Sequence, residues 1–104
     1  MGDKNCPIGR TVDVIGGKWT LYILRDLFEG TKRFGELRTS LSGISPKTLT
    51  EKLRELEQNE IVERTIYPEV PPRVEYSLTK KGKKLEPIFL AMRDWGTKNT
   101  LPVE

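Results

Sequence analysis

Two strand-like segments separated by a proline-rich loop restrict the fold more than any other feature of this chain. Residues 61–67 are rich in β-branched and aromatic side chains, and apolar and polar side chains alternate over residues 73–78. The intervening residues 68–72 include three prolines, which cannot extend a hydrogen-bonded ladder. The two segments therefore predict a single hairpin with a stiff loop.

Helical patterns occupy the chain before the hairpin. Apolar residues recur there at spacings of three and four residues, which is typical of amphipathic helices. The fourth helix has the clearest start, because Ser45 is a good N-cap residue and Pro46 suits the first helical position. The expected helices cover about residues 7–15, 18–29, 34–40 and 46–59.

A fifth helix is expected after the hairpin, with Thr79 as its N-cap and with Pro87 kinking it or shifting its start. This order of elements is typical of a winged helix-turn-helix. The 104 residues suffice for one domain, residues 1–104, which we expect to be mainly α with a two-stranded β-hairpin. Within it, residues 34–59 form the helix-turn-helix and residues 61–78 the wing.

The inventory of reactive side chains argues against an enzyme. The chain has no histidine, the commonest general base and a common metal ligand, and it has one cysteine, Cys6. It lacks the glycine-rich patterns that bind nucleotide phosphates. We therefore expect no catalytic residue, no metal and no cofactor. The lone cysteine and the lack of a membrane-spanning apolar run predict a cytoplasmic protein without membrane contact.

A series of short motifs runs along residues 6–96. They are Cys6-Pro7, Val14-Ile15-Gly16-Gly17-Lys18-Trp19, Ile23-Leu24-Arg25, Arg33-Phe34-Gly35-Glu36-Leu37, Gly43-Ile44-Ser45, Leu49-Thr50, Leu56-Glu57, Pro71-Pro72, Val74-Glu75-Tyr76-Ser77-Leu78-Thr79, Lys81-Gly82 and Trp95. In this order they resemble the HxlR-type winged-helix regulators, which are relatives of the MarR-type repressors. Gly9 and Glu60 depart from the family, which often has Glu and Gly at these positions. The resemblance implies a homodimer that binds operator DNA and controls nearby genes.

The fourth helix is the expected DNA reader. Leucines at positions 49, 53 and 56 define its inner side, so the polar side chains between them point outward. In helix-turn-helix proteins the N-terminal part of such a helix meets base edges in the major groove. Its candidate DNA-binding residues are Ser45, Lys47, Thr48, Thr50, Glu51 and Arg54.

Basic residues outside this helix complete the candidate interface. Arg73, beside the loop, is placed to enter the minor groove, and Arg64 lies in the opposing strand. Lys32 and Arg33, before the third helix, are candidates for phosphate contacts. The alternative for each of these four residues is an ordinary surface charge that contacts no DNA. Since the net charge of +3 permits an anionic partner without requiring one, a protein–protein adaptor is the alternative function.

The terminal helices, residues 6–17 and 79–98, are expected to join two copies of the chain. Their apolar stripes are more than so small a domain needs for its own core, although an intrachain role is the alternative. The expected interface residues are Ile8, Val12, Leu85, Phe89, Met92 and Trp95.

Cys6 is the candidate for a chemical switch. It precedes Pro7, so we expect it to be the N-cap of the first helix, whose N–H groups favour the reactive thiolate. The resemblance implies that some relatives use this cysteine to sense oxidants or electrophiles. A chemically idle thiol near the terminus is the alternative.

Overall fold

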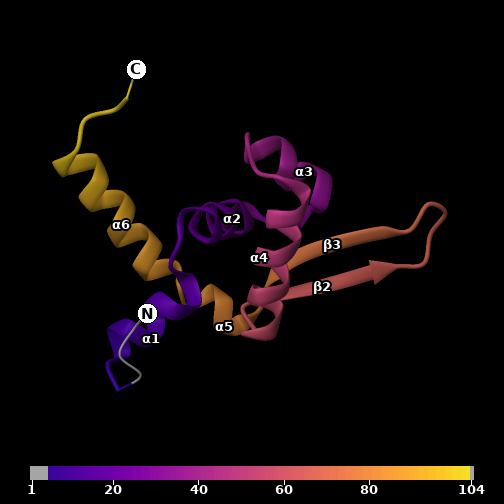
Figure 1. The fold of residues 1–104 in the computed structure, drawn as a ribbon, viewed down its shortest axis with the longest axis horizontal. Coiled ribbons are helices and arrows are strands. Elements are labelled where there is room, and N and C mark those ends of the chain that lie inside the picture. The colour runs from indigo at the N-terminus through magenta and orange to yellow at the C-terminus, as the bar shows by residue number, and fades with distance from the viewer. Residues whose placement is uncertain (1–4, 104) are drawn as a thin grey trace.

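The observed elements follow the predicted order, with one added strand. The structure is a computed structural model that describes residues 5–103 (Figure 1). Its elements are α1 (Pro7–Ile15), α2 (Lys18–Glu29), β1 (Lys32–Arg33), α3 (Phe34–Ser40), α4 (Pro46–Gln58), β2 (Val62–Tyr67), β3 (Arg73–Leu78), α5 (Lys80–Lys83) and α6 (Glu86–Asn99). None of the helices in this described range has the length and apolar character needed to cross a membrane.

The sheet is larger than the sequence predicts. β2 and β3 form the expected antiparallel hairpin, with Val62 opposite Leu78. The expectation of two strands is wrong in one respect, because β1 pairs with the other edge of β3 and gives the order β1-β3-β2. Two residues are too few to show an alternating pattern, so β1 has no signal in the sequence.

The core lies where α2 and α4 meet α3 and the sheet. Each helix contributes its apolar face, and the fully buried side chains are Ile23, Leu24, Leu37, Leu49, Leu53 and Leu56. Tyr76 and Leu78 of β3 close this core from the sheet side. The hairpin extends to one side of the central helices, while α1 and α6 lie on the other side (Figure 1).

The C-terminal helical region is divided in two. The Thr79 hydroxyl accepts a hydrogen bond from the Gly82 backbone N–H at 3.0 Å, so its predicted N-cap role is confirmed. The same hydroxyl donates to the backbone oxygen of Glu60 at 2.6 Å, which ties α5 to the end of α4. A new helix, α6, begins at Glu86 with Pro87 in its first turn, so the predicted shift of the helix start is also confirmed.

Glu60 takes the backbone conformation that usually belongs to glycine. Its φ is 61°, whereas that of Asn59 is −84°. The N–H of Ile61 bonds to the oxygen of Leu56, and the N–H of Glu60 to the oxygen of Glu57, both at 2.9 Å. This is the Schellman pattern of a helix C-terminus. Glu60 therefore stays in the left-handed region because it ends α4 and directs the chain into β2.

We predict that Glu60→Gly raises the free energy of unfolding by about 1 kcal/mol, because glycine adopts a positive φ without the Cβ penalty. Urea denaturation of the two proteins measures the change. Asn59→Gly is the matched control, since Asn59 has an ordinary φ and glycine there should not stabilise. An equal or lower stability of Glu60→Gly contradicts the prediction.

Candidate nucleic-acid interface

The start of α4 is held by its own first residues. The Ser45 hydroxyl accepts a hydrogen bond from the Thr48 backbone N–H at 3.0 Å and donates to the Thr48 hydroxyl at 2.9 Å. The predicted N-cap is therefore confirmed. Lys47, between them, is exposed, so its ammonium group is the first charge that a partner meets at this end of α4.

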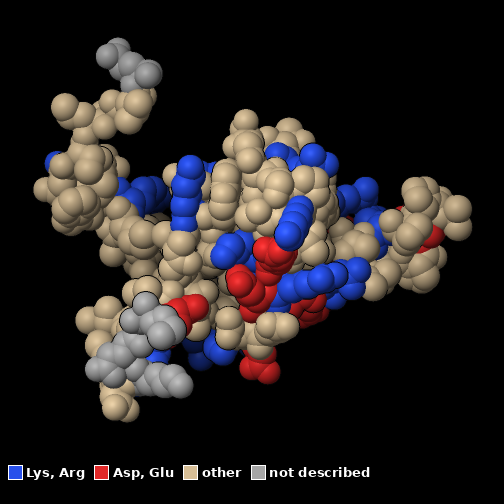
Figure 2. Space-filling model, viewed as in Figure 1, with Lys and Arg blue, Asp and Glu red and all other residues tan. Residues whose placement is uncertain are grey.

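The outward face of α4 is the one that its leucines require. Because Leu49, Leu53 and Leu56 are almost completely buried, the opposite side of the helix must face solvent. Glu51 and Arg54 are exposed there and Thr50 is half-buried. Figure 2 shows basic and acidic side chains intermixed over α4 and the root of the hairpin, so this face is not uniformly positive.

The Arg73 side chain is fixed by contacts with its neighbours in the hairpin. Its guanidinium lies 4.1 Å from the centre of the Tyr67 ring. It also forms ion pairs with Glu69 at 3.2 Å and with Glu75 at 3.3 Å. Two carboxylates therefore offset its charge in the free protein, and only about 29% of its side chain is exposed.

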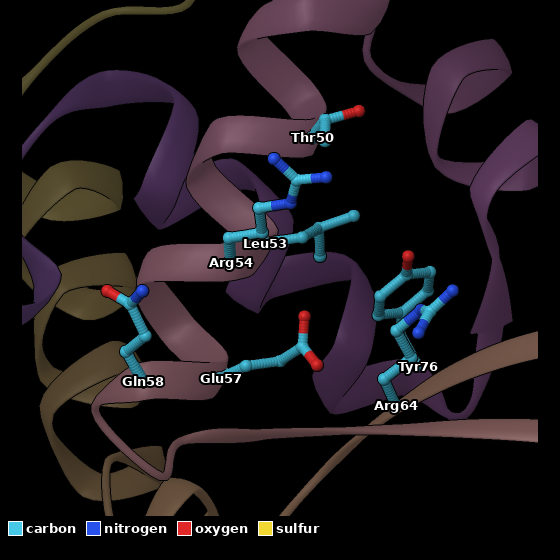
Figure 3. A pocket seen from close by; sticks show the side chains of 7 residues that line it. All are labelled: Thr50, Leu53, Arg54, Glu57, Gln58, Arg64 and Tyr76. Atoms are coloured by element: carbon cyan, nitrogen blue, oxygen red, sulfur yellow. The ribbon is translucent and has the colours of Figure 1, made fainter.

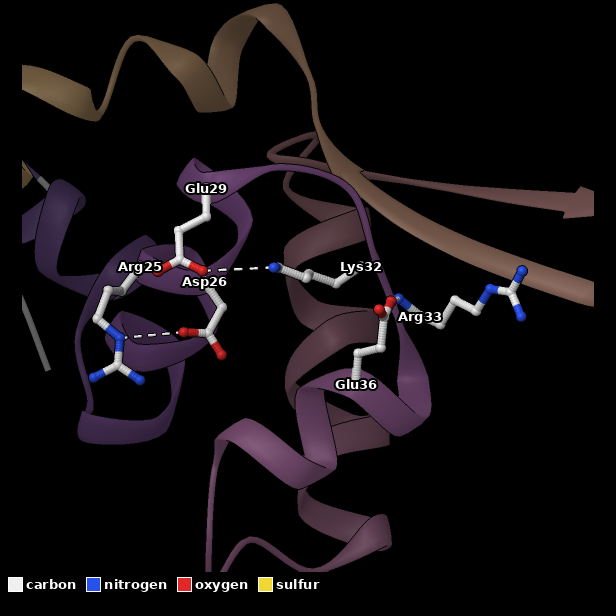
Figure 4. Close-up of polar contacts among 6 residues, drawn as sticks. All are labelled: Arg25, Asp26, Glu29, Lys32, Arg33 and Glu36. Atoms are coloured by element: carbon white, nitrogen blue, oxygen red, sulfur yellow. Dashed lines mark hydrogen bonds and ion pairs between the residues drawn. The ribbon is translucent and has the colours of Figure 1, made fainter.

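Lys32 and Arg33 are adjacent in sequence but serve different contacts (Figure 4). The Lys32 ammonium pairs with Glu29 of α2 at 3.5 Å. The Arg33 backbone N–H donates to the Glu36 carboxylate at 2.8 Å and so caps α3, while its side chain extends away from Lys32. The Arg33 side chain is exposed, so its guanidinium is open to a phosphate, whereas the half-buried Lys32 is already paired.

Arg38, an exposed basic side chain in the last turn of α3, is a further candidate that the motifs and the outward face of α4 do not single out. It forms no ion pair with any residue in the described range. The first helix of a helix-turn-helix crosses the DNA backbone, which makes such a residue a candidate for a phosphate contact. Its position next to the inward-facing Leu37 is the signal that could have found it.

Three of the predicted residues meet at a cavity of about 410 Å³ between α4 and the hairpin. Thr50 and Arg54 line it from α4, and Arg64 lines it from β2 (Figure 3). The remaining lining residues are Leu53, Glu57, Gln58 and Tyr76. Arg54 and Arg64 are both exposed, and neither forms an ion pair within the described part of the chain.

The apolar residues of the terminal helices fall into two groups. Leu85 and Phe89 pack against the chain's own core, where the Phe89 ring lies 5.0 Å from that of Phe28. The other four are largely exposed: Ile8 by 75%, Val12 by 54%, Met92 by 46% and Trp95 by 63%.

Cys6 occupies the N-cap position of α1, as the sequence predicts. It is half-buried, and its thiol makes no capping hydrogen bond to the helix.

The comparisons with known proteins decide the family. The model of the HxlR-like helix-turn-helix family matches residues 14–104. This chain belongs to the HxlR family. The resemblance seen in its motifs is thereby confirmed, and the protein is a transcriptional regulator with a helix-turn-helix domain, not an enzyme.

Relatives of this HxlR-family protein match it over most of their length. The HTH-type transcriptional regulator YdeP of Bacillus subtilis is 48% identical over 95 residues, which cover 91% of this chain and 74% of YdeP. YodB of the same organism is 44% identical over 96 residues, covering 91% and 86% of the two chains.

Solved structures confirm the winged-helix fold of this HxlR-family chain. The redox regulator HypR in its oxidised form has a TM-score of 0.87 and 48% identity, covering 93% of this chain and all of that one. A MarR-family regulator from Porphyromonas gingivalis has a TM-score of 0.88 and 39% identity, covering 95% and 97%.

Proposed function

We propose that this protein binds double-stranded operator DNA in a sequence-specific manner, with α4 in the major groove and the β2–β3 hairpin at the adjacent minor groove. The observation that carries the proposal is the capped N-terminus of α4, which presents Lys47 and Glu51 on one exposed face of the helix that lies beside the hairpin. Helix N-terminal residues are the ones that reach base edges in this motif. We place this activity in the cytoplasm.

The proposed contacts follow from side-chain chemistry. Lys47 can donate to guanine, and Glu51 can accept from the amino group of cytosine. The hydroxyls of Ser45, Thr48 and Thr50 suit phosphates or bases. Around them, Lys32, Arg33 and Arg38 suit the backbone on the α3 side, and Arg73 suits the minor groove if DNA displaces its two carboxylates.

We predict that Lys47→Ala and Arg73→Ala each weaken binding to the operator by about 1–3 kcal/mol if the side chain reads a base. The operator is obtained by selecting bound fragments from a random duplex library, and affinity is measured by fluorescence anisotropy. Lys18→Ala is the control, because Lys18 is exposed at the start of α2, outside α4, the hairpin and the proposed dimer helices, and forms no ion pair among the described residues. Unchanged affinity in both variants refutes these two assignments. A wild type that binds no duplex favours the adaptor function.

We also propose that two copies pair through α1 and α6. The proposal is supported by α6, which has no buried residue among those described, and by the exposed Ile8 and Val12 of α1. An apolar groove of about 530 Å³ runs between α2 and α6 and includes Tyr22, Phe89 and Met92. So much exposed apolar surface is typical of an interface. Leu85 and Phe89 support this surface from within.

We predict a dimer of twice 11.9 kDa at micromolar concentration, with the two recognition helices about 34 Å apart, one turn of DNA. Sedimentation equilibrium measures the mass. Trp95→Glu should shift the protein toward monomer, because it places a charge in the apolar interface. Leu101→Glu, which changes an exposed leucine beyond α6, should leave the mass unchanged. A folded wild-type monomer contradicts the dimer.

Finally, we propose that modification of Cys6 alters operator binding. Its N-cap position on α1, next to the exposed Ile8, would place the thiol beside the proposed dimer interface. The similarity to the redox regulator HypR, solved in oxidised and reduced forms, supports this role. With one cysteine per chain, the products are an adduct with an electrophile, a mixed disulfide with a small thiol, or a Cys6–Cys6 link between subunits.

We predict that treatment with a quinone or a hydroperoxide changes the operator affinity of the wild type and leaves that of Cys6→Ser unchanged. Mass spectrometry identifies the product on Cys6, and anisotropy measures the affinity. If both proteins respond equally, or if neither responds, Cys6 is not the switch.

A further inference from the structure

The cavity between α4 and the hairpin contains positive charge that the fold itself does not use. Arg54 enters it from the recognition helix and Arg64 from the wing, and neither has an ion-pair partner among the described residues. Arg73, farther along the hairpin, differs because Glu69 and Glu75 hold its guanidinium. The two cavity arginines are thus available to an anion from outside.

The place of the cavity follows the geometry of duplex DNA. The major and minor grooves are separated by one sugar–phosphate strand. When α4 lies in the major groove and the hairpin reaches the adjacent minor groove, that strand must pass between them. The space between α4 and the hairpin is this cavity, with Arg54 on one wall and Arg64 on the facing wall (Figure 3).

The side chains of the cavity suit a phosphate. Guanidinium groups bind phosphate oxygens through paired N–H donors, and the Thr50 hydroxyl adds a further donor. Glu57 also lines the cavity and extends from α4 toward Arg64 and Tyr76 (Figure 3). Two guanidiniums and one carboxylate leave one net positive charge, which matches the single negative charge of one phosphodiester.

We propose that this cavity is the seat of the backbone phosphate between the two grooves, held by Arg54 and Arg64, and that Glu57 weakens the hold. The seat contributes affinity for every duplex alike and carries no sequence preference. Glu57 lowers the affinity for every duplex, unrelated DNA included, because its carboxylate repels the phosphate. The inference rests on the proposed DNA binding and adds to it the roles of these three side chains.

The test compares Arg54→Gln, Arg64→Gln and Glu57→Gln on the operator and on an unrelated duplex, over a range of salt concentrations. Each arginine variant should weaken binding to both duplexes by the same factor, roughly five- to tenfold at 0.1 M salt. The plot of the logarithm of the association constant against the logarithm of the salt concentration should become less steep, its negative slope shrinking in magnitude by about 0.9. Glu57→Gln should strengthen binding to both duplexes by a similar factor. Circular dichroism melting establishes that each variant is folded.

Two matched controls separate the cavity from the overall charge of the protein. Lys18→Gln removes a positive charge from the start of α2, outside the cavity and the proposed dimer helices, and Glu63→Gln removes a negative charge from β2 at a position that alternates with Arg64. Both should bind like the wild type. Arginine variants that match the wild type on both duplexes, or that lose affinity for the operator alone, overturn the phosphate seat while leaving the proposed DNA binding intact. Failure of the wild type to bind either duplex overturns the proposed function itself.

Discussion

Burial of three leucines on one side of α4 is the constraint on which the rest of the structure depends. Leu49, Leu53 and Leu56 pack between α2 and the sheet, and each is at most 1% exposed. A rotation of α4 about its axis would take these side chains out of the core, at a cost of about 2 kcal/mol for each one exposed. The leucines therefore determine which polar side chains face outward, so packing and recognition are two sides of one helix.

Regular patterns made most of the fold predictable. The capped start of α4, the proline-divided hairpin and the restart of the last helix all depend on neighbouring residues, and each was visible in the sequence. β1 was not visible, because its pairing with β3 is a long-range contact of two residues. The burial of Asp26 in α2 was equally invisible in the sequence. The residue is only 4% exposed, and its carboxylate lies 3.2 Å from the Arg25 guanidinium (Figure 4). Its burial depends on the elements that pack around α2 and not on its sequence neighbours.

The candidate site was predictable in its members but not in their grouping. Sequence spacing places Lys47, Glu51 and Arg54 on one side of α4, since helical geometry is local. It does not reveal that Arg64 faces the same cavity as Arg54, or that two carboxylates hold Arg73. These relations depend on how the hairpin docks against the helix. For the same reason, spacing could not separate Phe89, which packs inward, from Trp95, which is exposed.

The hydroxyl of Thr79 lies where three elements meet at the root of the wing. It follows the last residue of β3, caps α5 and bonds to Glu60 at the end of α4. Gly82 allows this closeness, because a Cβ at that position would lie 2.3 Å from the backbone oxygen of Ile61. These bonds fasten α5 to the end of α4 and to the root of the wing. A displacement of α5 must therefore move the root of the wing with it or break these hydrogen bonds.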